Sequence, residues 1–261
     1  MARKYVVTGA ASGIGKALTE QLRAEGSTVF GVDLRDADVT VDLTTEQGRA
    51  DLVTSVAELS GGTIDAIVAV AGLAAPIPAT VGVNYFGAVA TLEGLRPLLT
   101  GSDAPRAAVV ASLAALEPVD APLLAALLAG DESKALELAT AIADAPTDTP
   151  SNAIYNSSKN AIALWVRHHA PTAEWAGAGI ALNAIAPGVI ETPMIAEILA
   201  TEEGRAALAA GAPMPLNGPA APAAAPAAIL AWLTSAQNTH VTGQVVFVDG
   251  GAEVLRRPDA V

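Results

Sequence analysis

The feature that most constrains the fold is the alternation of short apolar segments of strand length with longer segments of helical periodicity. The run 64–71 has almost no polar residue, which is typical of a strand covered on both faces of a parallel sheet. Segment 45–60 instead places Leu52, Val56 and Leu59 at helical spacing on one face. This order predicts an α/β fold, a doubly wound parallel sheet with helices on both faces.

The expected strands are 4–8, 28–33, 39–41, 64–71, 107–111, 180–185 and 244–248, and the expected helices are 14–25, 45–60, 80–99, 152–176 and 220–235. No repeat or linker divides the chain, so residues 1–261 are predicted to form a single domain. Segment 113–150, rich in Ala and Leu, is expected to add one or two helices. Segment 187–218, with a helical stretch near 194–209, is expected to cover the substrate, because it leaves the carboxyl edge of the sheet, where ligands bind. Segment 113–150 leaves the same edge and either covers the substrate too or decorates the surface.

Composition excludes several function classes. The chain has no cysteine and three histidines, two of them adjacent, so neither a disulfide scaffold nor a metal site is expected. Its 27 acidic and 14 basic side chains give a net charge of −13, which argues against nucleic acid and anionic membranes as partners. No secretory signal pattern or membrane span is visible, so a cytoplasmic location is expected.

A glycine-rich loop lies between the first expected strand and the first expected helix. It reads Thr8-Gly9-Ala10-Ala11-Ser12-Gly13-Ile14-Gly15. Glycines in this position allow a tight turn and close approach of a pyrophosphate to backbone N–H groups at a helix N-terminus. Asp33 ends the second strand, where a carboxylate accepts hydrogen bonds from an adenosine ribose. The alternative for Asp33 is an ordinary turn or cap residue.

Tyr155 and Lys159 form a second motif. They lie four residues apart on an expected helix and therefore share a face. An ammonium group beside a phenol lowers the phenol pKa, which makes Tyr155 a candidate proton donor to a carbonyl or acceptor from an alcohol. Ser112 ends the fifth strand at the same edge and could hold the substrate oxygen. Asn84 is placed at the start of the helix after the fourth strand, where the alternative is a helix N-cap.

These motifs belong to a longer ordered set. Its members are Thr8-Gly9-x-x-x-Gly13-Ile14-Gly15, Asp42-Leu43, Ala71-Gly72, Val83-Asn84, Ser112, Tyr155-x-x-x-Lys159, Asn183-x-Ile185-x-Pro187-Gly188, Thr192 and Asp249-Gly250-Gly251. Over almost its whole length the chain thereby resembles the short-chain dehydrogenase/reductase family. The resemblance implies a Rossmann fold and NAD(P)-dependent interconversion of an alcohol and a carbonyl compound.

The resemblance also implies roles for single residues. Tyr155 is the general acid/base, Lys159 lowers its pKa and binds the nicotinamide ribose, Ser112 orients the substrate oxygen, and Asn84 supports a proton-relay water. The residues expected to contact the cofactor are Gly9, Ser12, Gly13, Ile14, Gly15, Asp33, Asp42, Leu43, Ala71, Gly72, Tyr155, Lys159, Pro187, Gly188, Val189 and Thr192. Asp42 would meet the adenine, and Thr192 the nicotinamide amide or phosphate.

The chain departs from the usual family pattern in two places. Ala69 and Val70 replace the two Asn that usually follow the fourth strand, which puts one hydrogen bond of that turn in doubt. Insertion 113–150 separates Ser112 from Tyr155 by 43 positions. This insertion, Val83-Asn84-Tyr85-Phe86-Gly87 and Ala186-Pro187-Gly188 with Glu191-Thr192-Pro193 are similar to the bacterial 3α-hydroxysteroid dehydrogenase/carbonyl reductase group, several of whose enzymes act on steroids, cyclic terpenoid alcohols or other bulky ketones.

Cofactor and substrate expectations follow. NAD is expected over NADP, because Asp33 would bind a free 2′-hydroxyl and repel a 2′-phosphate, while Arg35 argues in the other direction. Bulky apolar secondary alcohols of cyclic, steroid or monoterpenoid type are the expected substrates. This expectation rests on the apolar side chains of the covering segment after Pro187, which are Val189, Ile190, Met194, Ile195, Ile198, Leu199, Met214 and Leu216.

Two other function classes fit the same fold class, a non-catalytic dinucleotide sensor and a structural oligomer component. A complete Ser, Tyr, Lys and Asn set disfavours the first, and the glycine loop with Asp33 disfavours the second. A homodimer is expected rather than a tetramer, with 220–235 and the last strand contributing to the contact. The resemblance implies that the helix with the Tyr-x-x-x-Lys motif and the helix before it pack against a partner subunit. The leucines of 113–150 would either fold over the substrate cleft and block this helix-to-helix interface or create a new interface of their own. The alternative is a tetramer with the insertion outside.

Overall fold

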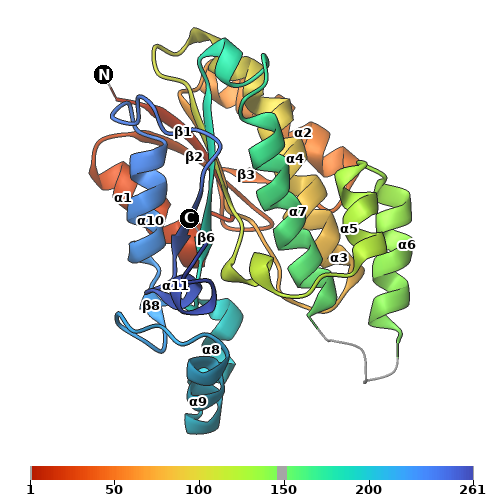
Figure 1. Cartoon of the computed structure of the whole chain (residues 1–261). Coiled ribbons are helices and arrows are strands. Elements are labelled where there is room, and N and C mark those ends of the chain that lie inside the picture. Colours follow the sequence, from red (N-terminus) through yellow and green to blue (C-terminus); the bar gives the residue numbers. More distant parts are fainter. Residues whose placement is uncertain (1, 146–151, 261) are drawn as a thin grey trace.

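The computed structural model describes residues 2–145 and 152–260 and is built on a seven-stranded parallel sheet (Figure 1). The strands are β1 Lys4–Thr8, β2 Thr28–Asp33, β3 Val39–Thr40, β4 Ala66–Ala69, β5 Arg106–Val110, β6 Ala181–Pro187 and β9 Val245–Val248. Their order is β3-β2-β1-β4-β5-β6-β9, so the chain winds outward in both directions from β1. The predicted doubly wound α/β fold is confirmed, and its switch point between β1 and β4 is where ligands bind in such sheets.

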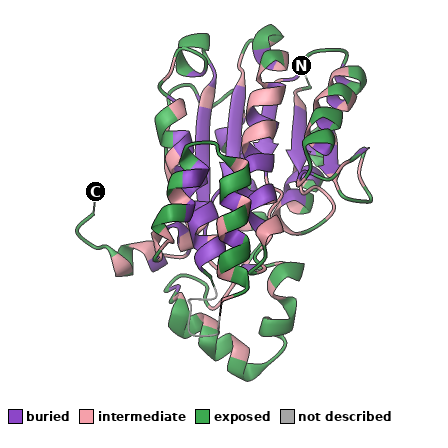
Figure 2. Cartoon of the chain, turned by 90° about the vertical axis from the view of Figure 1, so that its right-hand side faces the viewer, coloured by how far each residue is buried: buried purple, intermediate pink, exposed green. Residues whose placement is uncertain are grey.

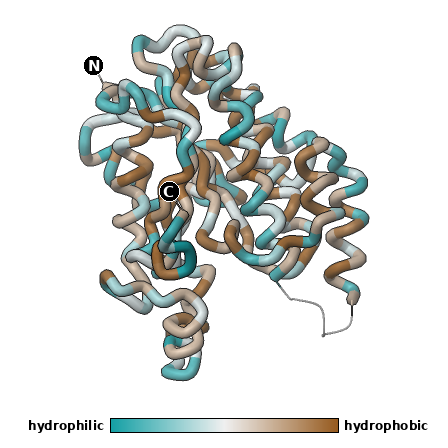
Figure 3. Tube along the Cα trace, in the orientation of Figure 1, coloured by the Kyte–Doolittle hydropathy of each residue, from teal (hydrophilic) through white to brown (hydrophobic). Residues whose placement is uncertain are grey.

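Helices cover both faces of the sheet. Helices α1 Gly13–Ala24 and α10 Ala224–Leu233 lie on one face, and α2 Glu46–Ser60, α4 Ala88–Leu95 and α7 Ala153–His169 on the other (Figure 1). Alternating side chains of β1 supply the two cores, because Val6 packs with the α2, α4 and α7 side chains, whereas Val7 packs with those of α1 and α10. The central strands β1, β4, β5 and β6 are therefore buried on both sides (Figure 2), and hydrophobic residues run through the sheet and the adjoining helices (Figure 3).

Some helices differ from the prediction. Helix α7 ends at His169 rather than 176, because Pro171 lacks the N–H that would continue the helix and disfavours helical geometry before it. The segment predicted at 80–99 runs from α3 Pro78–Val81 through a π-helix at Gly82–Gly87 and α4 into a 3-10 helix at Arg96–Gly101. Leu59, expected on the buried face of α2, is 54% exposed.

The insertion forms a 3-10 helix at Leu113–Leu116 and two helices, α5 Ala121–Leu128 and α6 Glu132–Ala143; residues 146–150 of the predicted segment lie outside the described part. Asp120 and Asp131 cap α5 and α6 with their side chains. The two helices pack beside α3 and α7, at the far side from α1 (Figure 1). Leu123 and Leu127 are buried in the core of the same chain, so these leucines need neither a substrate nor a partner to cover them.

The segment after β6 extends beyond the sheet. It contains β7 Ile190–Glu191, paired with β8 Ala221–Pro222, then a 3-10 helix at Pro193–Ile195 and helices α8 Ala196–Leu199 and α9 Glu202–Gly211. Figure 1 shows α8 and α9 projecting below the sheet, near α11 Ala252–Arg256. Among the residues that the structure describes, no helix is both long enough and apolar enough to cross a membrane.

Candidate active site

The glycine loop connects β1 to α1 and leaves little room for a side chain at its glycine positions. Gly9 and Gly13 have positive φ values of 70° and 54°. A Cβ on Gly15 would lie 2.2 Å from the carbonyl oxygen of Gly9, and one on Gly13 would lie 3.1 Å from Cγ2 of Thr192. Ser12, the N-cap residue of α1, makes no side-chain hydrogen bond to the helix, so the first-turn N–H groups of α1 face the loop without that cap. The glycine loop and the N-terminus of α1 together form a cradle that fits the pyrophosphate of a dinucleotide.

Asp33 ends β2 beside this loop. Its Oδ2 accepts a hydrogen bond from the Ala11 N–H at 3.0 Å, and its Oδ1 accepts one from the Leu34 N–H at 2.7 Å. The carboxylate therefore does serve the turn, which was the alternative interpretation. Each carboxylate oxygen has further acceptor capacity, however, so the two roles are compatible and a ribose hydroxyl can still be bound.

The turn after β4 closes the other side of the cradle. Thr8 Oγ1 accepts hydrogen bonds from the N–H groups of Val70 at 3.0 Å and Ala71 at 3.1 Å. The threonine side chain thus holds the turn although Ala69 and Val70 replace the family's two asparagines. A Cβ on Gly9 would lie 3.0 Å from Cα of Ala71, so the glycine loop and this turn are in close contact.

Asp42 and Leu43 follow β3. Oδ1 of Asp42 accepts hydrogen bonds from the Thr44 N–H at 2.9 Å and the Thr44 hydroxyl at 2.7 Å. These two hydrogen bonds lower the pKa of Asp42, and the nearby Arg49 charge adds to the effect. Leu43 is buried. The Asp42 carboxylate is therefore ionised and fixed next to the first turn of α2.

Lys159 lies at the centre of the site. Its Nζ donates a hydrogen bond to the carbonyl oxygen of Val110 at 2.8 Å and lies 5.9 Å from the centre of the Tyr155 ring. A Cβ on Gly72 would lie 3.4 Å from this Nζ, which places the β4 turn directly beside it. Burial lowers the pKa of Lys159 to about 8, so the ammonium group remains mostly charged at neutral pH.

Tyr155 differs from the expectation. Burial raises its pKa, a hydrogen bond with Ser112 acts in the opposite direction, and burial prevails. The expected lowering of the Tyr155 pKa by Lys159 is thus not found. Ser112 caps the following 3-10 helix, because its Oγ accepts a hydrogen bond from the Ala114 N–H at 3.1 Å. The structure does bring Tyr155, Lys159 and Ser112 together, as the spacing predicted.

Asn84 does not begin a helix. It lies inside the π-helix, where its Oδ1 accepts from the Leu73 N–H at 2.8 Å. Its Nδ2 donates to the Leu73 carbonyl oxygen at 2.9 Å and to Ser158 Oγ at 3.0 Å. The N-cap interpretation is therefore wrong, and Asn84 joins the β4 turn to α7. π-Helical turns are frequent at functional sites. The sequence carried no signal for this π-helix or for the hydrogen bond that Ser158 accepts from Asn84.

The β6 terminus completes the edge. The Gly188 N–H donates to the Val248 carbonyl oxygen at 3.1 Å, and the Ala221 N–H donates to that of Val189 at 2.9 Å. A Cβ on Gly188 would lie 3.0 Å from Cα of Asp249, so this position also requires glycine. After Pro187 the chain turns back toward the glycine loop, which it reaches through Thr192.

Comparison with known proteins agrees with this arrangement. The family model described as short chain dehydrogenase matches residues 3–122, and the model described as enoyl-(acyl carrier protein) reductase matches residues 123–253. The chain is 35% identical over 258 residues, 97% of both chains, to the 3-alpha-hydroxysteroid dehydrogenase/carbonyl reductase of Comamonas testosteroni. It is 32% identical over 267 residues to the cis-4-hydroxycyclohexanecarboxylate dehydrogenase of Sinomonas cyclohexanicum, covering 95% of this chain and 96% of that relative.

Solved structures show the same likeness. The 3-alpha-hydroxysteroid dehydrogenase of Pseudomonas sp. B-0831, complexed with NADH, superimposes with a TM-score of 0.87 at 37% identity, over 99% of this chain and 100% of that one. Pseudomonas aeruginosa RhlG in complex with NADP shares the fold, with a TM-score of 0.75 at 23% identity over 97% of both chains. The chain therefore belongs to the short-chain dehydrogenase/reductase family of oxidoreductases and is similar to its hydroxysteroid dehydrogenases.

Proposed function

We propose that the chain is an NAD-dependent dehydrogenase/reductase that interconverts bulky apolar secondary alcohols and their ketones, with Tyr155 as the general acid/base. The observation that carries the proposal is the convergence of Tyr155, Lys159 and Ser112 beside the glycine cradle at the carboxyl edge of the sheet. A proton-transfer group next to a dinucleotide cradle is the arrangement that hydride-transfer chemistry requires.

The side chains would act as follows. In alcohol oxidation Tyr155, as phenolate, accepts the hydroxyl proton that Ser112 helps to orient, and the carbinol carbon gives up a hydride to become a ketone carbon. A bound NAD supplies the hydride acceptor. Lys159, charged at neutral pH and with its Nζ 5.9 Å from the centre of the Tyr155 ring, would stabilise the negative phenolate once it forms. In ketone reduction the neutral phenol of Tyr155 donates the proton, and the raised pKa of this group favours the donor form.

The charges around Asp33 support NAD. Among the described residues, Arg23 and Arg35 are basic side chains near this strand end. Arg23 is already bound, because its Nη2 lies 2.7 Å from Oδ2 of Asp38, and the same oxygen accepts from the Gly31 N–H at 2.7 Å. A 2′-phosphate would therefore meet two carboxylates and compete with Asp38 for Arg23. Arg35 is exposed, and because its cation could bind a 2′-phosphate it opposes the NAD assignment.

The covering segment supports an apolar substrate. Met194 and Ile198, on the segment that follows β6, are 50% and 44% exposed, and Met214 packs in a small apolar cluster with Leu113 of the insertion. Met and Leu side chains adapt to different apolar shapes. The relatives named above act, by their names, on a hydroxysteroid and on a hydroxylated cyclohexane carboxylate. The exposed Met194 and Ile198 favour an apolar substrate, and the names of the relatives favour a carbocyclic ring, over a sugar or a phosphorylated substrate.

An activity screen tests the proposal. NAD and NADP are each combined with steroid, monoterpenoid and simple cyclic alcohols and with a polar hydroxy acid. Turnover of a cyclic alcohol with a higher kcat/KM for NAD than for NADP supports the proposal. A kcat/KM with NADP equal to or above that with NAD refutes the cofactor assignment, and faster turnover of an acyclic polar hydroxy acid than of every cyclic alcohol refutes the substrate class. Dinucleotide binding without any turnover would instead indicate a sensor.

A further inference from the structure

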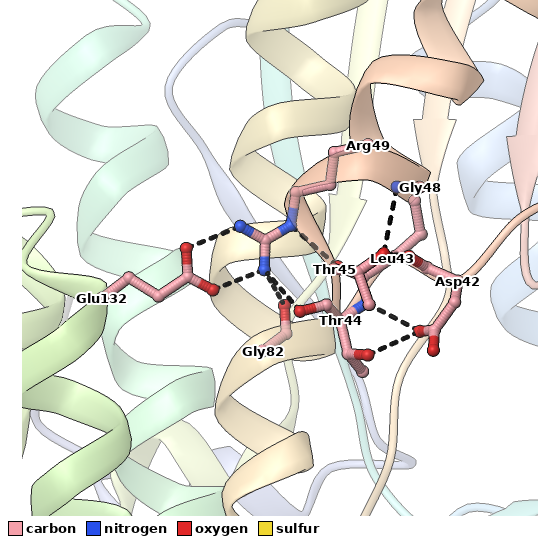
Figure 4. Close-up of polar contacts among 8 residues, drawn as sticks. All are labelled: Asp42, Leu43, Thr44, Thr45, Gly48, Arg49, Gly82 and Glu132. Carbon is pink, nitrogen blue, oxygen red and sulfur yellow. Dashed lines mark hydrogen bonds and ion pairs between the residues drawn. The ribbon is translucent and has the colours of Figure 1, made fainter.

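Arg49 connects the insertion to the 42–45 loop, which carries Asp42 and Leu43. Its guanidinium group forms a bidentate ion pair with Glu132 of α6, with Nη1–Oε2 and Nη2–Oε1 distances of 2.7 and 2.6 Å (Figure 4). The same group donates to the Leu43 carbonyl oxygen from Nε at 2.8 Å and to the Thr44 carbonyl oxygen from Nη2 at 3.3 Å. One planar side chain thus holds α6 and the backbone of the loop at once.

The 42–45 loop is closely packed on its other sides. A Cβ on Gly48, in the first turn of α2, would lie 2.0 Å from the Asp42 carbonyl oxygen, and one on Gly87 would lie 3.0 Å from Cβ of Leu43. Thr45 caps α2 by accepting from the Gly48 N–H at 3.0 Å. These contacts hold the start of α2 and the Leu43 side chain, whereas the Leu43 and Thr44 carbonyl groups are held by Arg49, so a displaced guanidinium group would release those carbonyl groups.

The π-helix is tied to the same guanidinium group. Nη2 of Arg49 lies 3.5 Å from the Gly82 carbonyl oxygen, two residues before Asn84 (Figure 4). The Arg49 side chain is 11% exposed and that of Glu132 is 33% exposed, so the pair is screened from water more than a typical surface ion pair. Charge-assisted bidentate pairs with this geometry are among the stronger polar contacts in proteins.

We propose that Glu132, acting through Arg49, is a positioning residue that fixes the 42–45 loop for dinucleotide binding, so that the insertion contributes to cofactor affinity. The inference rests on the proposed function and on the family resemblance, which implies that Asp42 of this loop meets the adenine of the cofactor. Without Glu132 the guanidinium group loses its charged partner and turns toward water, and the Leu43 and Thr44 carbonyl groups lose a shared donor. The loop then samples other positions, and binding must restore the original one.

The test compares two glutamates of α6. Glu132→Gln removes the charge that pairs with Arg49, whereas the control Glu137→Gln removes an exposed ion pair with Lys134, whose Nζ–Oε1 distance is 2.8 Å. Dissociation constants for NADH and NADPH are measured by nucleotide fluorescence, beside the melting temperature and the KM for dinucleotide and alcohol. For the preferred dinucleotide we expect Glu132→Gln to raise Kd and KM about fivefold or more, with the loss on these constants rather than on kcat, and Glu137→Gln to stay within twofold of the wild type.

A second variant separates positioning from charge. Arg49→Lys keeps a cation near Asp42 but cannot contact Leu43 and Glu132 in the same fork, so we expect it to weaken dinucleotide binding as Glu132→Gln does. A Kd within twofold of the wild type in Glu132→Gln, or in Arg49→Lys, overturns the inference even if the melting temperature falls, because a merely structural contact would lower only the latter. Failure of the wild-type chain to bind either dinucleotide would overturn the proposed function and the inference with it.

Discussion

Replacing Lys159 by methionine should stabilise the cofactor-free protein while it removes activity. Burial lowers the pKa of Lys159 from 10.5 to about 8. A pKa difference of 1 corresponds to a free-energy difference of about 1.4 kcal/mol between the two protonation states. Keeping the ammonium group charged in the folded state at neutral pH therefore costs about 3 kcal/mol. Methionine removes this cost but leaves the Val110 carbonyl oxygen without its donor, which costs about 1–2 kcal/mol. The net gain in the free energy of unfolding at pH 7 is about 1–2 kcal/mol.

The gain should depend on pH in a defined direction. The folded pKa lies below the unfolded value, so between about pH 8 and 10.5 the unfolded wild type binds more protons than the folded one. The free energy of unfolding contributed by Lys159 therefore rises across this window, and the advantage of Lys159→Met shrinks as the buried amine becomes neutral.

Urea unfolding of both proteins without dinucleotide, at pH 7 and at pH 10 and followed by tryptophan fluorescence, measures the difference. A Lys159→Met protein that is less stable than the wild type at pH 7 would refute the reasoning. So would a stability difference that is the same at both pH values, because it would show that the charge of Lys159 is not what burial penalises.

Three further predictions concern the cradle, the pH profile and the assembly. Gly15→Ala should weaken NADH binding at least tenfold in a fluorescence titration, because its Cβ would lie 2.2 Å from the Gly9 carbonyl oxygen; near wild-type affinity would show that the cradle can open. Ketone reduction, which uses neutral Tyr155, should persist to higher pH than an ordinary phenol allows, while alcohol oxidation rises with pH; reduction that is already lost well below about pH 10 would contradict the raised pKa. Light scattering at micromolar concentration should give a mass near twice 26.0 kDa, because α5 and α6 lie against α7 and would obstruct the helix-to-helix interface that a tetramer needs. A mass near four times 26.0 kDa would contradict the dimer.

Much of the fold was predictable because its signals are local. The apolar runs at β1, β4 and β5 and the helical spacing in α1 and α2 each lie within one short window, and all have the predicted type. The motif residues Ser112, Tyr155 and Lys159 were predicted to meet because parallel strands and the helices after them share one edge, and they do meet.

The remaining features depend on contacts between distant segments. Arg49 and Glu132 are 83 positions apart, and no pattern in either segment indicates their ion pair. Asn84 lies in a π-helix, and its side chain bonds to Leu73 and Ser158, which only the folded chain brings together. The sign of the Tyr155 pKa shift was predicted wrongly because the adjacent Lys159 is visible in the sequence, whereas the extent of burial is not.

Turnover by Tyr155→Phe tests the central claim most directly. The substitution removes only the phenol oxygen from a helix whose packing is otherwise kept, so NADH binding measured by fluorescence should remain within a few-fold of the wild type. With the best cyclic alcohol of the screen, kcat/KM should fall by about a thousandfold or more, since the proton-transfer group is lost. Near wild-type turnover in Tyr155→Phe, with dinucleotide binding intact, would show that Tyr155 is not the general acid/base and would contradict the account.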